Sequence, residues 1–308
     1  MSNASKLPST LWHAFLKSSR SNPTASALSS PQQGISLSYS QLYDQCVGLS
    51  LGLKDRGVGP GSVVATDLPN VAEGIVLHLA CARLGSAVAT AKNEAVLESI
   101  PNVTCAVTTG EGPLFVPESV PSIRAGGGEL NDLLRWSGDV HDDFDMDRNE
   151  QDSQRALGFF NSPKPLTHES ALAQGSKMRE HFDMAPTDKV CVSITLYHAF
   201  GIGSACSSAL LSGAAIVLPA VGGLRGCGVP SQRAEVTLET LERERCTLLF
   251  ADSHTLRALH DDSLEEKLEG ADLSNLRGGV CKTGSGVEIL DDTVELQGVT
   301  LATLGKKK

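Results

Sequence analysis

The sequence predicts an α/β protein in which mostly parallel sheets carry helices on both faces. Short apolar runs such as residues 63–66 and 87–89 alternate along the chain with longer segments of helical periodicity such as 72–84. Helices of this length between strands are typical of crossovers that join parallel strands. Residues 190–224 contain no Asp, Glu, Lys or Arg, but glycines and a proline interrupt them. This stretch therefore indicates a buried strand–helix–strand unit and no transmembrane span.

In the first half of the chain, local signals predict each element in turn. Residues 40–56 read as a helix because apolar side chains recur on one face and Ser38 or Ser40 can cap it. Gly57 ends this helix, and Gly85 ends the next one. The predicted elements are helices over 10–19, 40–56 and 72–84, and strands over 63–66, 87–89 and 105–107.

The second half resumes the alternation after an irregular middle. Residues 141–152 hold six acids and one arginine, so a solvated connector is expected near 141–153. Thr167 precedes a helical segment as its cap. The predicted elements are strands over 156–160, 247–250 and 276–281, helices over 167–182, 237–244 and 255–260, and the unit over 190–218.

Composition excludes several classes of protein. Of the 308 residues, 41% are hydrophobic and 20% are charged, which is ordinary for a folded domain and excludes disorder. The net charge of −10 argues against nucleic acid as a partner, because phosphate binding needs a basic surface. The eight cysteines form no C-x-x-C pair, so they read as small buried hydrophobes in a reducing, intracellular compartment.

The amino-terminal segment leaves two interpretations open. Residues 1–43 contain no Asp or Glu and are rich in serine, which resembles a mitochondrial presequence. The alternative is a first amphipathic helix over 10–19 in a cytoplasmic protein.

Few residues carry a motif of catalysis or metal binding. Alternate residues of 143–149 have the spacing of a calcium loop, but Arg148 replaces its glycine and Gln154 its glutamate, so no metal site is expected. Phosphate-loop and nucleophile-elbow motifs are absent. His198 is the one histidine that we single out, because it follows a predicted strand and carboxyl ends of parallel strands line ligand crevices.

Several segments, in this order and spacing, resemble the amino-terminal domain of the adenylate-forming enzymes, which include the acyl-CoA synthetases. They are residues 38–42 with 51–61, 68–70 with the helix to 84 and 85–87, 188–201, 211–218, 241–250 and 272–277. Tyr197, His198 and Gly201 resemble part of the family's F-H-x-x-G segment.

The resemblance implies two similar αβ sub-domains. One would comprise 1–58 plus 225–305, and the other 60–222. The small barrel and the carboxy-terminal domain of the family would be missing, and 306–308 would be a basic tail. The family uses ATP and magnesium to convert a carboxylate into an acyl-adenylate, which it transfers to a thiol such as CoA.

Of three segments that carry this chemistry in the family, two are altered here. In the phosphate loop, Ser162, Lys164 and Thr167 fit its end, but its Gly/Thr body is missing and Pro165, which has no N–H, replaces its last glycine. In the segment 297–303, Ala302 replaces the family's phosphate-contacting threonine, and Thr303 replaces its magnesium-binding glutamate. The nucleotide-facing turn corresponds to 281–286, which includes Gly284.

These departures favour a catalytically degenerate member that acts as a scaffold or as a subunit of a larger assembly. No catalytic residue and no cofactor are then expected. Another protein chain would cover the apolar surface that the missing barrel leaves exposed. One alternative is an ATP- and magnesium-dependent ligase that another chain completes. The other is a binder of an acyl group, CoA or a nucleotide. If a cleft survives, its candidate residues are Ser162, Lys164, Thr167, His198, Gly201 and Gly284.

Overall fold

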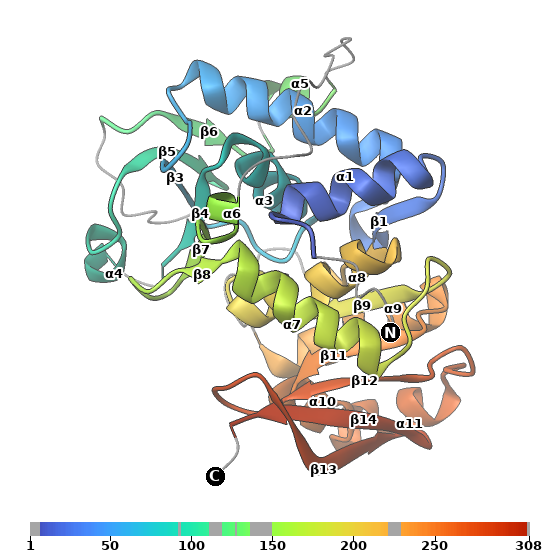
Figure 1. The fold of residues 1–308 in the computed structure, drawn as a ribbon. Helices are drawn as coiled ribbons and strands as arrows, with labels where there is room; N and C mark the ends of the chain where they lie inside the picture. The colour runs from blue at the N-terminus through green and yellow to red at the C-terminus, as the bar shows by residue number, and fades with distance from the viewer. Residues whose placement is uncertain are drawn as a thin grey trace, which may run out of the picture.

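A computed structural model describes residues 7–91, 94–110, 119–126, 128–135, 150–220 and 229–306. These residues form two sheets with helices between and outside them (Figure 1). The prediction of an α/β fold with mostly parallel strands is confirmed.

The larger sheet has the strand order β13-β14-β12-β11-β9-β10-β1-β2. Its six central strands are parallel, and the antiparallel strands β2 and β13 form its two edges. The strands are β1 (Ser26–Ser30), β2 (Ile35–Ser38), β9 (Lys189–Ser193), β10 (Ala215–Val217), β11 (Leu248–Asp252), β12 (Gly278–Lys282), β13 (Glu288–Leu296) and β14 (Val299–Gly305).

The smaller sheet has the strand order β6-β5-β3-β4-β7-β8. All of its strands are parallel except β8, which folds back on β7 as a hairpin. The strands are β3 (Val63–Thr66), β4 (Ala87–Thr90), β5 (Val103–Thr108), β6 (Ser122–Arg124), β7 (Ala156–Phe160) and β8 (Leu166–Thr167).

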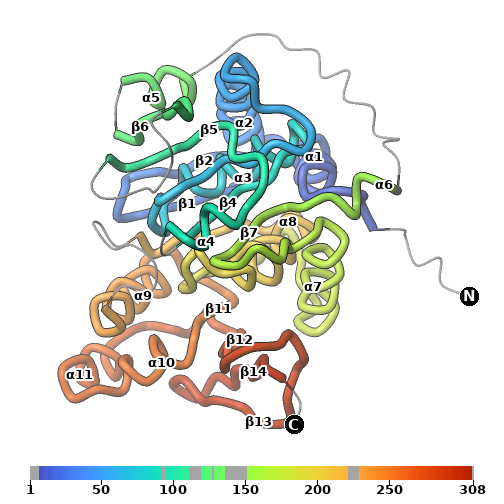
Figure 2. The backbone as a smooth tube through the Cα atoms, turned by 90° about the vertical axis from the view of Figure 1, so that its left-hand side faces the viewer, coloured from blue at the N-terminus to red at the C-terminus, as the bar shows by residue number. Residues whose placement is uncertain are grey.

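The helices make three layers around the two sheets. The main hydrophobic core lies between the sheets and includes buried residues of α1 (Leu11–Ser21), α2 (Tyr39–Asp55), α3 (Ala72–Leu84), α7 (His168–His181) and α8 (Ser207–Ser212). A second cluster joins the outer face of the larger sheet to α9 (Pro230–Glu244), α10 (Ser253–Leu259) and α11 (Asp262–Gly270). On the outer face of the smaller sheet a third, smaller cluster includes α4 (Glu94–Glu98). Both views place α7 and α8 between the two sets of strands (Figures 1 and 2).

Local signals locate most elements to within a few residues. Ser38 caps α2 and forms a reciprocal capping box with Gln41, which confirms the prediction of a cap at Ser38 or Ser40. Gly85 ends α3 in the left-handed conformation. The structure also contains elements that were not predicted. They are the hairpin β1–β2, helix α4, the short elements α5 (Gly128–Leu134) and α6 (Glu150–Ser153), strands β6 and β8, helix α11 and the hairpin β13–β14.

Strand pairing departs from the predicted division of the chain. Strands β9 and β10 lie within 60–222 but pair in the larger sheet, between β11 and β1. The physical reason is that the buried strand–helix–strand unit inserts its parallel strands between the two predicted parts of the other sub-domain. Most of the acidic connector near 141–153, and Lys307 and Lys308 of the basic tail, lie outside the described residues.

The amino-terminal helix is part of the core. Thr10 caps α1, and Leu11, Trp12, Phe15 and Leu16 are at most 2% exposed, so the predicted helix over 10–19 is confirmed. Among the described residues, no helix is long and apolar enough to cross a membrane. The seven described cysteines are buried and free, as expected, and burial raises the pKa of six of their thiols, those of Cys46, Cys81, Cys105, Cys191, Cys206 and Cys281.

Two buried histidines predict a loss of stability in acid. Burial lowers the pKa of His78 and of His168 from 6.5 to about 3, and nearby His13 and Arg155 contribute at His168. The Nδ1 of His168 accepts a hydrogen bond from the N–H of Leu11 at 3.2 Å, which requires the neutral ring. Between pH 6.5 and 3 the unfolded chain therefore binds more protons than the folded one.

The free energy of unfolding is expected to fall as the pH drops below 6.5, by up to about 1.4 kcal/mol per pH unit for each histidine. Urea unfolding at pH 7, 6, 5 and 4 measures this slope. The variant His78→Gln should lose the share of the slope due to His78. A slope that is the same in the variant and the parent would contradict this assignment.

Candidate functional site

The carboxyl edges of both sheets meet at residues 194–200, the segment that follows β9. From the smaller sheet, the side-chain amide of Asn70, after β3, donates to the carbonyl of Val192 in β9, just before this segment, at 3.1 Å. The hydroxyl of Thr90, the last residue of β4, donates to the carbonyl of Tyr197 at 3.3 Å. From the larger sheet, the ammonium of Lys282 at the end of β12 lies 6.0 Å from the ring centroid of Phe200. A ligand crevice is expected at such an edge.

Two consecutive turns set the position of His198. Its N–H donates to the carbonyl of Thr195 at 3.1 Å, and the N–H of Gly201 donates to the carbonyl of His198 at 3.0 Å. A Cβ at Gly201 would lie 3.0 Å from the carbonyl oxygen of Thr195, so glycine lets these turns close. The structure therefore brings the predicted residues His198 and Gly201 together, with His198 half-buried.

A π-helical turn over Gly201–Cys206 carries the chain from this segment into α8. It packs against the β8–α7 unit: the hydroxyl of Ser204 donates to the side chain of Gln174, in the middle of α7, at 3.1 Å. A Cβ at Gly203 would lie 3.0 Å from the side chain of Leu166 in β8. Insertions of this kind are frequent at functional sites.

The predicted phosphate-loop residues lie on the tight hairpin that joins β7 to β8. The N–H of Lys164 donates to the Ser162 hydroxyl at 3.1 Å, while Lys164 itself is exposed. Asn161 adopts a left-handed φ of 52°, and its N–H donates to the carbonyl of Thr90 at 2.8 Å. Thr167 caps α7 by accepting the N–H of Ser170 at 3.2 Å. The hydroxyls of Ser162 and Thr167 therefore both accept hydrogen bonds from backbone N–H groups of their own chain segment.

At the nucleotide-facing turn, the notable side chain is Lys282, which the sequence analysis did not select. Its ammonium is partly buried, donates to the carbonyl of Gly286, and has a pKa lowered by burial. Gly284, the predicted residue, is exposed in the turn with a φ of 66°. The signal that could have identified Lys282 is its place directly after the predicted strand 276–281.

Strand β14 contains the residues expected in place of the phosphate and magnesium contacts. Thr303 is 4% exposed, and its hydroxyl donates to the carbonyl of Asp292 in β13 at 2.6 Å. Ala302 pairs with Val280 of β12. Within the described ranges, no group of three or more His, Cys, Asp or Glu residues is placed to hold a metal ion.

Comparisons with known proteins agree with the fold. A family model described as "AMP-binding enzyme" matches residues 15–103 and 164–295, more than half of the chain. A feruloyl-CoA synthase of Amycolatopsis sp. is 25% identical over 276 residues, which cover 86% of this chain and 52% of that protein. The chain therefore spans about half the length of this relative.

Solved structures show the same architecture. The nonribosomal peptide synthetase FmoA3 (S1046A) matches 99% of this chain and 32% of its own, with a TM-score of 0.70 at 18% identity. The N-terminal domain of FACL13 from Mycobacterium tuberculosis matches 89% of this chain and 70% of its own, with a TM-score of 0.68 at 15% identity. The chain thus has the fold of an amino-terminal adenylation subdomain and belongs to the AMP-binding enzyme family of the adenylate-forming superfamily.

Proposed function

We propose that this chain is a catalytically degenerate, acyl-CoA-synthetase-like member of the AMP-binding family that acts as a scaffold or as a subunit of a larger assembly. The observation that carries the proposal is the β7–β8 hairpin, which stands where the family's phosphate loop is expected. Its tip is Pro163-Lys164-Pro165, so two of three successive residues lack the N–H that a phosphate oxygen needs. The hydroxyls that flank the tip are engaged by backbone N–H groups.

The residues present do not fit the magnesium ion that accompanies ATP in the family. Mg²⁺ takes hard oxygen ligands, usually one or two carboxylates besides the substrate phosphates. At the position expected for the carboxylate, Thr303 offers a hydroxyl that is buried and already hydrogen-bonded to Asp292. No step of a reaction is therefore assigned to ATP or magnesium here.

The partner in this proposal is another protein chain. Among the described residues, three large apolar side chains are exposed, those of Leu7, Val229 and Val287. Within the described part of the chain, strand β13 is an edge strand that pairs with β14 alone. It carries four acidic residues, so it offers both backbone groups and negative charge to a partner.

Calorimetry with ATP and Mg²⁺, together with a pyrophosphate-exchange assay, tests the loss of catalysis. We expect no saturable heat at millimolar nucleotide and no exchange above the level of a heat-denatured control. Exchange that depends on a carboxylic acid substrate would contradict the proposal. The variant Lys164→Ala is the matched control. If the hairpin no longer binds phosphate, replacement of the exposed Lys164 should leave any residual heat or exchange unchanged.

A second candidate function is that of an acyl-adenylate-forming ligase. Two observations favour it: the partly buried ammonium of Lys282 lies near residues 194–200, and a relative is described as a feruloyl-CoA synthase. A non-hydrolysable acyl-adenylate mimic should then bind with micromolar affinity. That binding should be lost in His198→Ala and weakened in Lys282→Met, whereas absence of binding would exclude this candidate.

A further inference from the structure

A cavity lies at the edge of the smaller sheet opposite to residues 194–200. It has a volume of about 360 Å³, and its lining includes the first residues of three neighbouring parallel strands, Val63 of β3, Ala87 of β4 and Ala156 of β7. Parallel strands start at one edge and end at the other. The cavity therefore lies at the amino edge, whereas the candidate site described above lies at the carboxyl edge.

The cavity occupies the thinly covered outer face of this sheet. Val63, Ala87 and Phe159 belong to the small hydrophobic cluster of that face. The one described helix that contributes a buried residue to this cluster is α4, which has five residues. The small side chains at the strand starts and the short helix leave this cavity unfilled. The volume of the cavity is within the ~300–1,000 Å³ typical of small-molecule sites.

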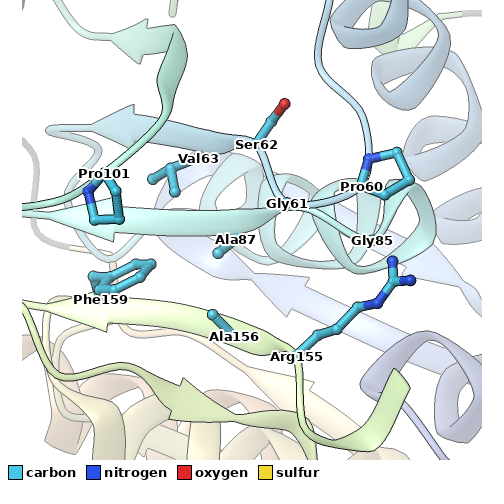
Figure 3. A pocket seen from close by; sticks show the side chains of 10 residues that line it. All are labelled: Pro60, Gly61, Ser62, Val63, Gly85, Ala87, Pro101, Arg155, Ala156 and Phe159. Carbon is cyan, nitrogen blue, oxygen red and sulfur yellow. The ribbon is translucent and has the colours of Figure 1, made fainter. Parts of the chain in front are cut away.

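Figure 3 shows that the cavity has an apolar end and a cationic end. The rings of Phe159 and Pro101 lie at one end, and Arg155 extends toward Gly85 at the other. The hydroxyl of Ser62 already accepts the N–H of Gly59 at 3.1 Å. Arg155 is thus the charged group that the lining offers to a ligand.

Arg155 is held in place by the protein. Its Nε pairs with the carboxylate of Asp152 at 3.0 Å, and its carbonyl accepts the N–H of His168 at 3.2 Å. A Cβ at Gly85 would lie 2.7 Å from Nη1, so the absence of a side chain there makes room for the guanidinium. The side chain remains 41% exposed, which leaves its terminal nitrogens accessible to an acceptor.

We propose that this amino-edge cavity binds a small aromatic monocarboxylate, with the ring against Phe159 and Pro101 and the carboxylate on the terminal nitrogens of Arg155. Guanidinium and carboxylate form charge-assisted, bidentate hydrogen bonds. A single cation already paired with Asp152 favours a monoanion over a phosphate dianion. The apolar lining favours a ring over a polar body.

Titration calorimetry of the full chain with 3-phenylpropanoate tests the proposal. We expect saturable binding with a Kd of about 1 mM or tighter. The neutral analogue 3-phenylpropanamide should bind at least about tenfold more weakly, and so should the acid to Arg155→Met. The variant Ala156→Phe, which fills the cavity and keeps the cation, should also lose binding, and the thermal midpoint of each variant checks that it is folded.

Variants at the opposite edge separate this cavity from the candidate site. Binding of 3-phenylpropanoate should be unchanged in His198→Ala and in Lys164→Met. Loss of binding in His198→Ala with retention in Arg155→Met would place the ligand at the carboxyl edge and overturn the proposal. Equal affinity for acid and amide, or no saturable binding to the folded parent at about 10 mM, would also overturn it.

Discussion

Replacement of Asp252 by alanine is expected to lower the free energy of unfolding by about 3–5 kcal/mol, because it leaves a buried arginine without its counter-ion. Arg233 of α9 is 5% exposed, and its Nη2 lies 3.1 and 3.0 Å from the two carboxylate oxygens of Asp252. Asp252 also caps α10, since it accepts the N–H and the hydroxyl of Thr255 at 2.8 and 3.0 Å.

The loss is large because the rest of the guanidinium has no alternative partner. The Nε and Nη1 atoms of Arg233 are buried and have no hydrogen-bond partner in the part of the chain that the structure describes. Removal of the Asp252 carboxylate would leave the buried positive charge of Arg233 without its counter-ion. The reciprocal variant Arg233→Met should cost less, because Asp252 keeps its two bonds to Thr255 and lies at a helix amino terminus.

Urea unfolding at pH 7 measures both variants, and Glu235→Ala provides a matched control on the same helix. Glu235 pairs with Lys267, but both side chains are well exposed, at 41% and 56%. Exposed pairs contribute little, so the control should cost less than about 1 kcal/mol. If Asp252→Ala lowered the free energy of unfolding no more than Glu235→Ala does, the buried Arg233–Asp252 pair would not stabilise the fold as inferred.

The elements that the sequence predicted well are those with local signals. Helix α2 begins at a capping box that Ser38 and Gln41 form within one turn, and α3 ends at a left-handed glycine. Strand β3 occupies its predicted residues, since a short apolar run between a glycine-rich turn and Pro69 has few alternatives as a buried strand. Here propensity and tertiary packing favour the same conformation.

The elements that were missed depend on distant partners. Strand β1 has the serine-rich sequence SALSS, which has no strand pattern of its own, but it pairs in parallel with β10. Strand β13 carries four acidic residues, which weaken its local strand signal, and it forms because it pairs with β14. Tertiary pairing overrides weak local preference in both cases.

The candidate site was predicted in part, for the same reason. The position of His198 and Gly201 after a buried strand follows from the strand pattern and the carboxyl-edge rule. The commitment of the Thr167 hydroxyl to the α7 cap also follows from sequence, because a threonine before a helix is a usual cap. The approach of Lys282 to Phe200 could not be predicted, since it depends on how two distant strand ends are arranged in space.

The variant Gly175→Ala should destabilise the protein by about 2–3 kcal/mol, although alanine is the better helix former. Gly175 lies within α7, where α7 packs against α8. A Cβ there would lie 2.7 Å from Cβ of Ser207 and 2.8 Å from backbone atoms of Ser207 and Ser208. Backbone atoms cannot rotate away, so the helices must separate.

Gly270→Ala provides the matched control, because Gly270 ends α11 and, beyond its own helix and chain neighbours, no described atom lies within 4 Å of a Cβ built there. This control should leave the free energy of unfolding within about 0.5 kcal/mol of the parent. The α7–α8 contact also supports the π-helical turn over Gly201–Cys206. Gly175→Ala should therefore weaken any binding of an acyl-adenylate mimic at residues 194–200. An unfolding free energy for Gly175→Ala equal to that of Gly270→Ala would mean that α7 can shift away from α8 without loss of packing.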